Sequence, residues 1–178
     1  MKRESGFTIV ELVVVIIILG ILAATALPRF LDVSDDAHNS VVEAVAGSLQ
    51  SAAATYKGQW LVNDKPATVT LVTTAVGINS TSGFPNSVAG AGTWAIGDCD
   101  ELFTALQTGA PGIAASTAGT DPATAKAASD TVDWYVDDGS ASGTCVYWYG
   151  GRGANATGAT VSYDSTTGVV STNLSSDP

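Results

Sequence analysis

An uncharged stretch from Phe7 to Leu27 follows the basic residues Lys2 and Arg3, and a single carboxylate, Glu11, interrupts it. As a helix rising about 1.5 Å per residue, this stretch would span roughly 31 Å, which is enough to cross a bilayer. A carboxylate inside it costs on the order of a few kcal/mol, so Glu11 is a candidate functional residue. The segment therefore predicts a membrane-spanning helix that carries one ionisable group.

The helical pattern continues past Pro28, with apolar residues at steps of three or four. This spacing predicts an amphipathic helix that continues the apolar one and stops near Gly58. Proline removes a helix hydrogen bond, so we expect a kink near Pro28, with Gly20 as a second weak point. Alternatively, Gly20 allows close approach of another helix. The apolar positions are Phe30, Val33, Ala37, Val41, Val45, Leu49, Ala52, Tyr56 and Trp60.

The alternative to a retained helix is an ordinary secretory signal peptide cleaved at Ala24-Thr25-Ala26, which would release an exported binding protein. The apolar stretch is longer than the usual signal-peptide core of about 7–15 residues, and it contains Glu11. It also merges into the amphipathic helix, which a signal peptide has no reason to do. These observations favour the retained helix.

The segment from Gly6 to Ala23, with Phe7 after the glycine and Glu11 at the fifth position beyond it, resembles a known signature. It is similar to the N-terminus of type IV prepilins and of type II secretion pseudopilins. The resemblance implies cleavage between Gly6 and Phe7 by a prepilin peptidase, followed by N-methylation of Phe7. It also implies that Glu11 pairs with the Phe7 amine of a neighbouring subunit during assembly.

Two shorter motifs, Pro28-Arg29-Phe30-Leu31 and Asp35-Asp36-Ala37, resemble major pilins of the mannose-sensitive haemagglutinin type. The resemblance implies the α+β pilin fold, in which a long N-terminal helix packs against a small antiparallel sheet. The implied parts are a leader (residues 1–6), a membrane-spanning polymerisation half of the helix (7–27), an amphipathic half (28–60) and a globular head (61–178).

The same resemblance implies a homopolymer. The subunit would wait in the bacterial inner membrane, with its N-terminus in the cytoplasm and its head in the periplasm. Separate assembly machinery would then build it into an extracellular filament for adhesion. A minor pilin and a type II secretion pseudopilin remain alternatives, although the head lacks the calcium-loop pattern of major pseudopilins.

The position of Glu11 in an apolar stretch also limits its chemistry, independently of any resemblance. A lone carboxylate in lipid either binds a proton or finds a cation. Removal of the leader, which the resemblance implies, would create an α-amine at Phe7. The amine of an incoming subunit could then reach Glu11, neutralise both charges and set the axial register. The alternative is that Glu11 snorkels to the nearby membrane interface.

Removal of residues 1–6 leaves 5 basic and 16 acidic residues, a net charge of −11. Such an acidic surface has no electrostatic footprint for nucleic acid, so we expect no nucleic-acid partner. The only histidine, His38, lies on the polar side of the helix, remote in sequence from any nucleophile. We therefore expect a structural protein that is not an enzyme and needs no cofactor or metal.

Local patterns predict the elements of the head. Residues 68–72 are predicted as a short strand, 101–106 as a short helix and 109–130 as a surface loop. We expect an antiparallel meander of about four strands, packed on the apolar stripe of the helix. The four strands are predicted at 132–136, 144–149, 160–163 and 169–171.

Cys99 and Cys145 lie outside the membrane segment, in a compartment that we expect to be oxidising. A zinc site is not supported, because His38 is the only histidine and no ligand spacing is present. We predict a disulfide, which resembles the cysteine pair in the C-terminal region of many pilins. In the chain-entropy model it would stabilise the head by roughly 4 kcal/mol.

Aromatic residues raise a possible carbohydrate site. Trp134, Tyr135 and Trp148 lie on predicted strands, where alternation would leave some rings exposed to stack on sugars. The haemagglutinin resemblance makes a carbohydrate receptor tempting. Core and cross-strand packing is the alternative for the same rings.

Overall fold

The computed structural model describes residues 7–71, 73–88, 98–116, 132–137, 143–151 and 158–174. The chain divides into two compact units, Met1–His38 and Asn39–Pro178. The described part of the first unit is the beginning of helix α1 (Ile9–Val62), and the second unit holds the rest of α1 and the head. Helix α1 is continuous through Gly20 and Pro28. A continuous helix can still be bent, so the kink expected there stays a prediction.

Helix α1 continues past Gly58 and ends at Val62 in a defined cap. Asp64 and Lys65 have positive φ angles of 60° and 59°. The Lys65 N–H donates to the Trp60 carbonyl at 2.9 Å. A bond across six residues, with a left-handed residue just after the helix, is a Schellman cap, which satisfies a terminal helix carbonyl. The backbone turn therefore ends the helix, whereas the glycine stays inside it.

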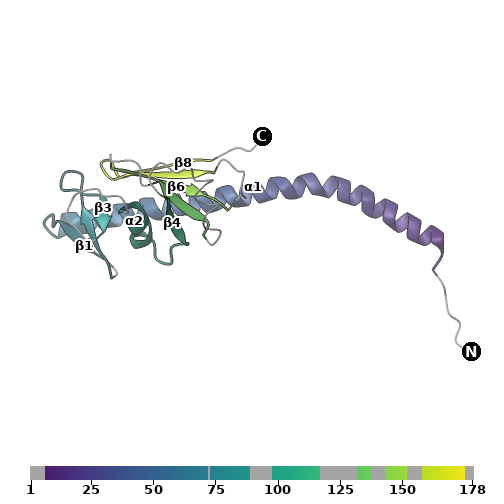
Figure 1. The fold of residues 1–178 in the computed structure, drawn as a ribbon, viewed down its shortest axis with the longest axis horizontal. Coiled ribbons are helices and arrows are strands. Elements are labelled where there is room, and N and C mark those ends of the chain that lie inside the picture. Colours follow the sequence, from purple (N-terminus) through teal and green to yellow (C-terminus); the bar gives the residue numbers. More distant parts are fainter. Residues whose placement is uncertain are drawn as a thin grey trace, which may run out of the picture. The chain divides into compact units, whose positions relative to one another are not determined.

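The described head contains two sheets and the short helix α2 (Asp98–Leu106) (Figure 1). The first sheet is antiparallel and has the order β1 (Thr68–Thr70), β2 (Ala75–Ile78), β3 (Pro85–Val88). The second sheet follows chain order from β4 to β8. Its strands are β4 (Ile113–Ser116), β5 (Trp134–Asp137), β6 (Thr144–Tyr149), β7 (Thr160–Asp164) and β8 (Val169–Asn173).

Strands β5 to β8 form the predicted antiparallel meander. The predicted loop at 109–130 is wrong in part, because Ile113–Ser116 forms β4 and pairs in parallel with β5. Strands β2 and β3 have no counterpart among the predicted elements. Alanines, an internal glycine (Gly77) and a proline (Pro85) are poor strand formers, so pairing with neighbouring backbone decides these strands. Residues 117–130 of the predicted loop lie outside the described residues.

One hydrophobic core joins α1 to both sheets inside the second unit. The predicted stripe is buried at Val45, Leu49, Tyr56 and Trp60, whereas Val41 is exposed. The helix therefore meets the head along a slightly rotated face. Its buried apolar residues are Val42, Val45, Ala46, Leu49, Ala53, Tyr56 and Trp60.

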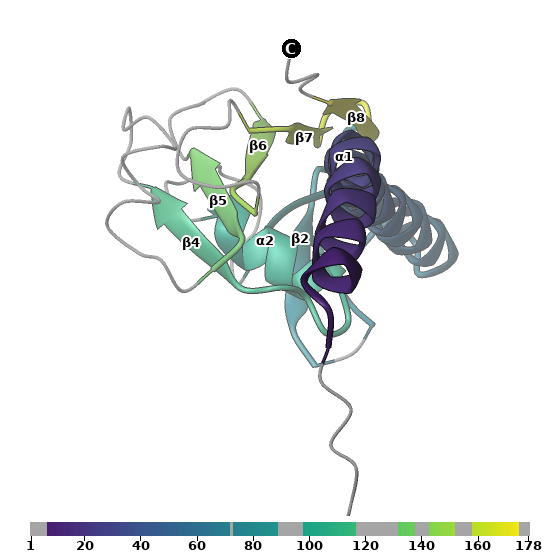
Figure 2. The ribbon, with the colours of Figure 1, turned by 90° about the vertical axis from the view of Figure 1, so that its right-hand side faces the viewer.

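Gln50 fastens strand β8 to α1. Its Nε2 donates to the Gly168 carbonyl at 3.1 Å, and the Val170 N–H donates to its Oε1 at 3.0 Å. The side-chain amide thus pairs with the outer edge of β8 as a further strand would. Figure 2 shows β8 beside α1, at the end of the sheet opposite to β4. Gly168 has a φ of 72° and lies against the Phe84 ring, so only glycine suits this turn.

Candidate assembly site

The N-terminal part of α1 presents an uncovered apolar surface. Residues Ile9–Leu27 are long and apolar enough to cross a membrane, and none of this span is buried. Its large apolar side chains are between 40% and 82% exposed. An apolar surface of this extent requires lipid or other protein as its cover.

Thr8 and Glu11 form a reciprocal cap at the start of α1. The Thr8 N–H and Oγ1 donate to Glu11 Oε2 at 3.0 and 2.9 Å, and the Glu11 N–H donates to Thr8 Oγ1 at 3.3 Å. Since α1 begins at Ile9, Thr8 is the N-cap and Glu11 the third helical residue, which is the capping-box arrangement. The pattern Thr-x-x-Glu was the available sequence signal for Thr8, and the sequence predictions missed it.

The cap leaves part of the Glu11 carboxylate available. Both donated bonds go to Oε2, and Oε1 accepts no hydrogen bond from any residue in the described part of the chain. One carboxylate carries about four acceptor positions. Glu11 can therefore hold its own helix start and still accept a cationic donor from outside.

The other predicted assembly residues lie along the same helix. Phe7 is 86% exposed, directly before the cap, whereas Gly6 lies outside the described residues. Gly20 has nothing within 4 Å of a Cβ position. Thr25 is a polar residue in the span, and its hydroxyl donates to the Leu22 carbonyl at 3.0 Å. The site is thus a continuous exposed rod with one available carboxylate oxygen.

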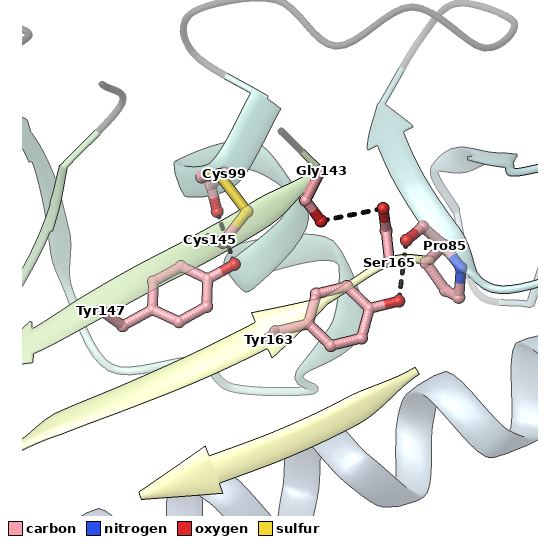
Figure 3. Close-up of a disulfide and its surroundings, with 7 residues drawn as sticks. All are labelled: Pro85, Cys99, Gly143, Cys145, Tyr147, Tyr163 and Ser165. Carbon is pink, nitrogen blue, oxygen red and sulfur yellow. Dashed lines mark hydrogen bonds between the residues drawn. A yellow bond between two sulfur atoms is a disulfide. The ribbon is translucent and has the colours of Figure 1, made fainter. Parts of the chain in front are cut away.

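In the head, the predicted disulfide joins α2 to the central strand β6 (Figure 3). Cys99 and Cys145 have an S–S distance of 2.05 Å and a Cα–Cα distance of 5.6 Å. The Tyr147 hydroxyl, on the same strand, donates to the Cys99 carbonyl at 3.0 Å. The bridge and this bond hold α2 against the sheet in a fully buried position.

Tyr163 ties the two sheets together. Its hydroxyl donates to the Pro85 carbonyl at 2.7 Å, so strand β7 holds the beginning of β3 (Figure 3). Burial raises the pKa of the Tyr163 phenol far above its usual value, with a smaller effect from the charge of Asp164. Next to it, the Ser165 hydroxyl donates to the Gly143 carbonyl at 3.0 Å.

The predicted sugar-stacking patch is wrong for two of its three rings. Trp134 and Tyr135 are each 1% exposed. Trp134 packs at 5.6 Å from Phe103 and 5.2 Å from Tyr149, centroid to centroid, and the Tyr135 hydroxyl donates to a backbone carbonyl. Trp148 is half-buried. Core packing therefore explains these aromatics, because β5 is covered on both faces.

Comparison with known proteins finds a family match at the N-terminus and several relatives. Residues 1–27 match the family model of the prokaryotic N-terminal methylation motif. A type IV narrow pilus major component, PilA5, of Thermus thermophilus is 50% identical over 50 residues, which cover 28% of this chain and 43% of that protein. Fimbrial protein Q of Moraxella bovis is 38% identical over 105 residues, covering 54% of this chain and 66% of that protein.

A second kind of relative also matches. Type II secretion system core protein G of Pseudomonas aeruginosa is 38% identical over 56 residues, covering 32% of this chain and 39% of that protein. The chain thus spans about two fifths to two thirds of the length of these curated relatives. No solved structure matches the chain.

Proposed function

Because this chain belongs to the type IV prepilin family, we propose that it is the structural subunit of a type IV pilus and polymerises through the first part of α1. The observation that carries the proposal is the exposed apolar rod of Ile9–Leu27 with Glu11 at its start. Before assembly this surface would lie in the inner membrane, with the head in the periplasm. In the extracellular pilus, copies of the same helix would cover it.

Assembly begins with processing in this proposal. A prepilin peptidase cleaves between Gly6 and Phe7, and the new terminus is N-methylated. The Phe7 amine of an incoming subunit then reaches Glu11 of a subunit already in place. Oε1 of Glu11 accepts that cation while Oε2 keeps its bonds to Thr8. Pairing removes two costly charges together and sets the axial position of each subunit.

Intact mass and N-terminal peptide mapping of the chain from sheared surface material test this proposal. The expected chain begins at N-methylated Phe7 and is two hydrogens lighter because of the Cys99–Cys145 bond. A chain that begins at Leu27 would overturn the fibre proposal, since Glu11 would be absent from the mature protein.

The second candidate is a minor pilin or a type II secretion pseudopilin, which the similarity to core protein G favours. Both candidates share the processing step, so abundance separates them. A major pilin that mediates attachment should dominate the sheared fibres, and its deletion should remove both the fibres and surface adhesion. A pseudopilin should be scarce there, and its deletion should block secretion instead.

A further inference from the structure

Thr8 and Glu11 stop helix α1 from extending toward Phe7. In a helix that continued toward the N-terminus, the Glu11 N–H would donate to the Phe7 carbonyl and the Thr8 N–H to the Glu4 carbonyl. Both donors are used elsewhere, because the Glu11 N–H donates to Thr8 Oγ1 at 3.3 Å and the Thr8 N–H donates to Glu11 Oε2 at 3.0 Å. The backbone ladder therefore begins with the bond from the Leu12 N–H to the Thr8 carbonyl, at 3.4 Å.

Phe7 consequently precedes the helix, and its side chain is 86% exposed. In the proposed function, a prepilin peptidase hydrolyses the peptide bond between Gly6 and Phe7. Water supplies the hydroxyl of the new Gly6 carboxyl group and a hydrogen of the new Phe7 amine. Peptidases cleave exposed, irregular backbone, and a helical segment must open before it can be cleaved. The place where α1 begins thus bears on the cleavage step.

The sequence before Thr8 offers earlier helix starts. Ser5 and Gly6 are both of residue types that occur as N-caps. A helix that began after either of them would include Phe7 in its first turn. Loss of a good N-cap shifts a helix equilibrium by about fivefold. The cap formed by Thr8 and Glu11 therefore favours the later start, with Phe7 outside the helix.

We propose that Thr8 is a positioning residue for leader cleavage: together with Glu11 it ends the helix before Phe7 and so presents the Gly6–Phe7 bond to the peptidase on non-helical backbone. This inference rests on the proposed function, because it concerns one step of it. It gives Glu11 two separable roles. The side-chain oxygen completes the cap, which a glutamine can also do, and the charge serves assembly.

Cleavage kinetics of the full chain in detergent, with a purified prepilin peptidase, test the proposal. Thr8→Ala should lower kcat/KM roughly threefold or more, although the variant should still be cleaved to completion. Thr25→Ala is the matched control, because it makes the same change in the same helix and removes only hydroxyl bonds to the Ile21 and Leu22 carbonyls. We expect the control to be cleaved at the wild-type rate. Equal rates for Thr8→Ala and the wild-type chain would overturn the proposal.

A substitution that keeps the cap without the hydroxyl separates conformation from direct recognition. Asparagine is a good N-cap but carries an amide in place of the hydroxyl. Thr8→Asn should therefore restore cleavage to within about twofold of the wild-type rate. If asparagine fails to restore the rate, whether or not Thr8→Ser does so, the peptidase recognises the side chain itself and the positioning role is wrong.

Carbon-13 chemical shifts of Phe7 in the uncleaved chain report its backbone conformation without the peptidase. Thr8→Ala should move the Cα and carbonyl shifts of Phe7 toward helical values, whereas Thr8→Asn and Thr25→Ala should leave them unchanged. Slow cleavage of Thr8→Ala without this movement would overturn the proposal.

Failure of this inference can be distinguished from failure of the proposed function. A wild-type chain that the peptidase leaves uncleaved contradicts the proposed function and the positioning role together. Normal cleavage of the wild-type chain with an unaffected Thr8→Ala contradicts the positioning role alone.

Discussion

Two stretches of helix α1 differ in the burial of their apolar side chains. In the first unit, α1 is almost entirely apolar, yet Leu19 is 58% exposed. In the second unit, α1 is far more polar, yet Leu49 is fully buried against the head. Burial of a side chain therefore depends on whether the chain supplies a partner for it, and hydrophobicity alone does not decide it. In the function proposed above, lipid or other copies of the chain cover the apolar surface of the first stretch.

The two stretches also use their polar residues differently. Glu11 caps its own helix with Oε2, and its Oε1 accepts no hydrogen bond from the described residues. In Gln50, both the Nε2 and the Oε1 of the side-chain amide form hydrogen bonds with the backbone at the edge of β8. Gln50 thus has both polar ends satisfied within the chain, whereas Glu11 keeps the acceptor capacity that the proposed pairing requires.

The largest expected effect is the loss of fibre assembly on substitution of Glu11, without a change in folding. Glu11→Gln keeps a side chain able to complete the capping box but removes the charge. We expect surface fibres to fall more than tenfold, measured by immunoblot of the sheared fraction, while cleavage and the unfolding of the head stay unchanged. Thr8→Ala is the comparison, because it loses the cap at a cost of about 1 kcal/mol and keeps the charge. Wild-type fibre levels in Glu11→Gln would contradict the proposed pairing.

The second largest expected effect is a loss of stability of the head when the disulfide is removed. Replacing both Cys99 and Cys145 by serine should lower the free energy of unfolding by about 4 kcal/mol. The unfolded chain would no longer be cross-linked over a sequence separation of 46 and would regain conformational entropy. Urea unfolding of the full chain in detergent, followed by tryptophan fluorescence, measures this. Reduced wild-type protein should show the same loss. A change below 1 kcal/mol would mean that the bridge does not constrain the unfolded state.

A matched pair of leucines tests the comparison within α1. Leu49→Ala removes a fully buried side chain and should cost about 2–5 kcal/mol of head stability. Leu19→Ala, in the exposed stretch, should change it by less than about 0.5 kcal/mol. The same urea experiment measures both variants. If Leu19→Ala destabilised the head as much as Leu49→Ala, the two units would not be independent.

The smallest effect concerns pH. The Thr166 hydroxyl and N–H donate to Asp164 Oδ1 at 2.6 and 2.7 Å, and the hydroxyl bond above all holds the pKa of Asp164 below its usual value of 3.8. Because the folded-state pKa is lowered, the stabilisation is present above about pH 3.8 and is lost as the pH falls through the lowered value.

Unfolding between pH 5 and pH 2.5 should therefore show a smaller acid loss for Asp164→Asn than for the wild-type chain. The variant keeps an oxygen acceptor for the turn but cannot titrate. Parallel pH curves for the two proteins would show that this carboxylate contributes nothing to acid sensitivity.

Much of this architecture could be predicted from local patterns. The long helix and the strands β5 to β8 each have a signal within a few residues, in apolar spacing or alternation. The cysteine pair is not local, but the sequence holds only two cysteines, so only one pairing within the chain is possible. The Thr8–Glu11 cap was equally local and was missed. Strands β2 and β4 were missed for a different reason, since their alanines and glycine carry no strand preference and the partner strand determines them.

The membrane-length helix and its lone carboxylate can be derived from the order of residues alone, because a helix makes its hydrogen bonds between near neighbours. The processing site is only implied by the resemblance to prepilins. The burial of Trp134 and Tyr135 cannot be derived in this way. Trp134 and Phe103 come from different elements, and so do Tyr163 and Pro85. Contacts between residues so far apart exist only after the chain has folded, since they depend on where packing brings each element.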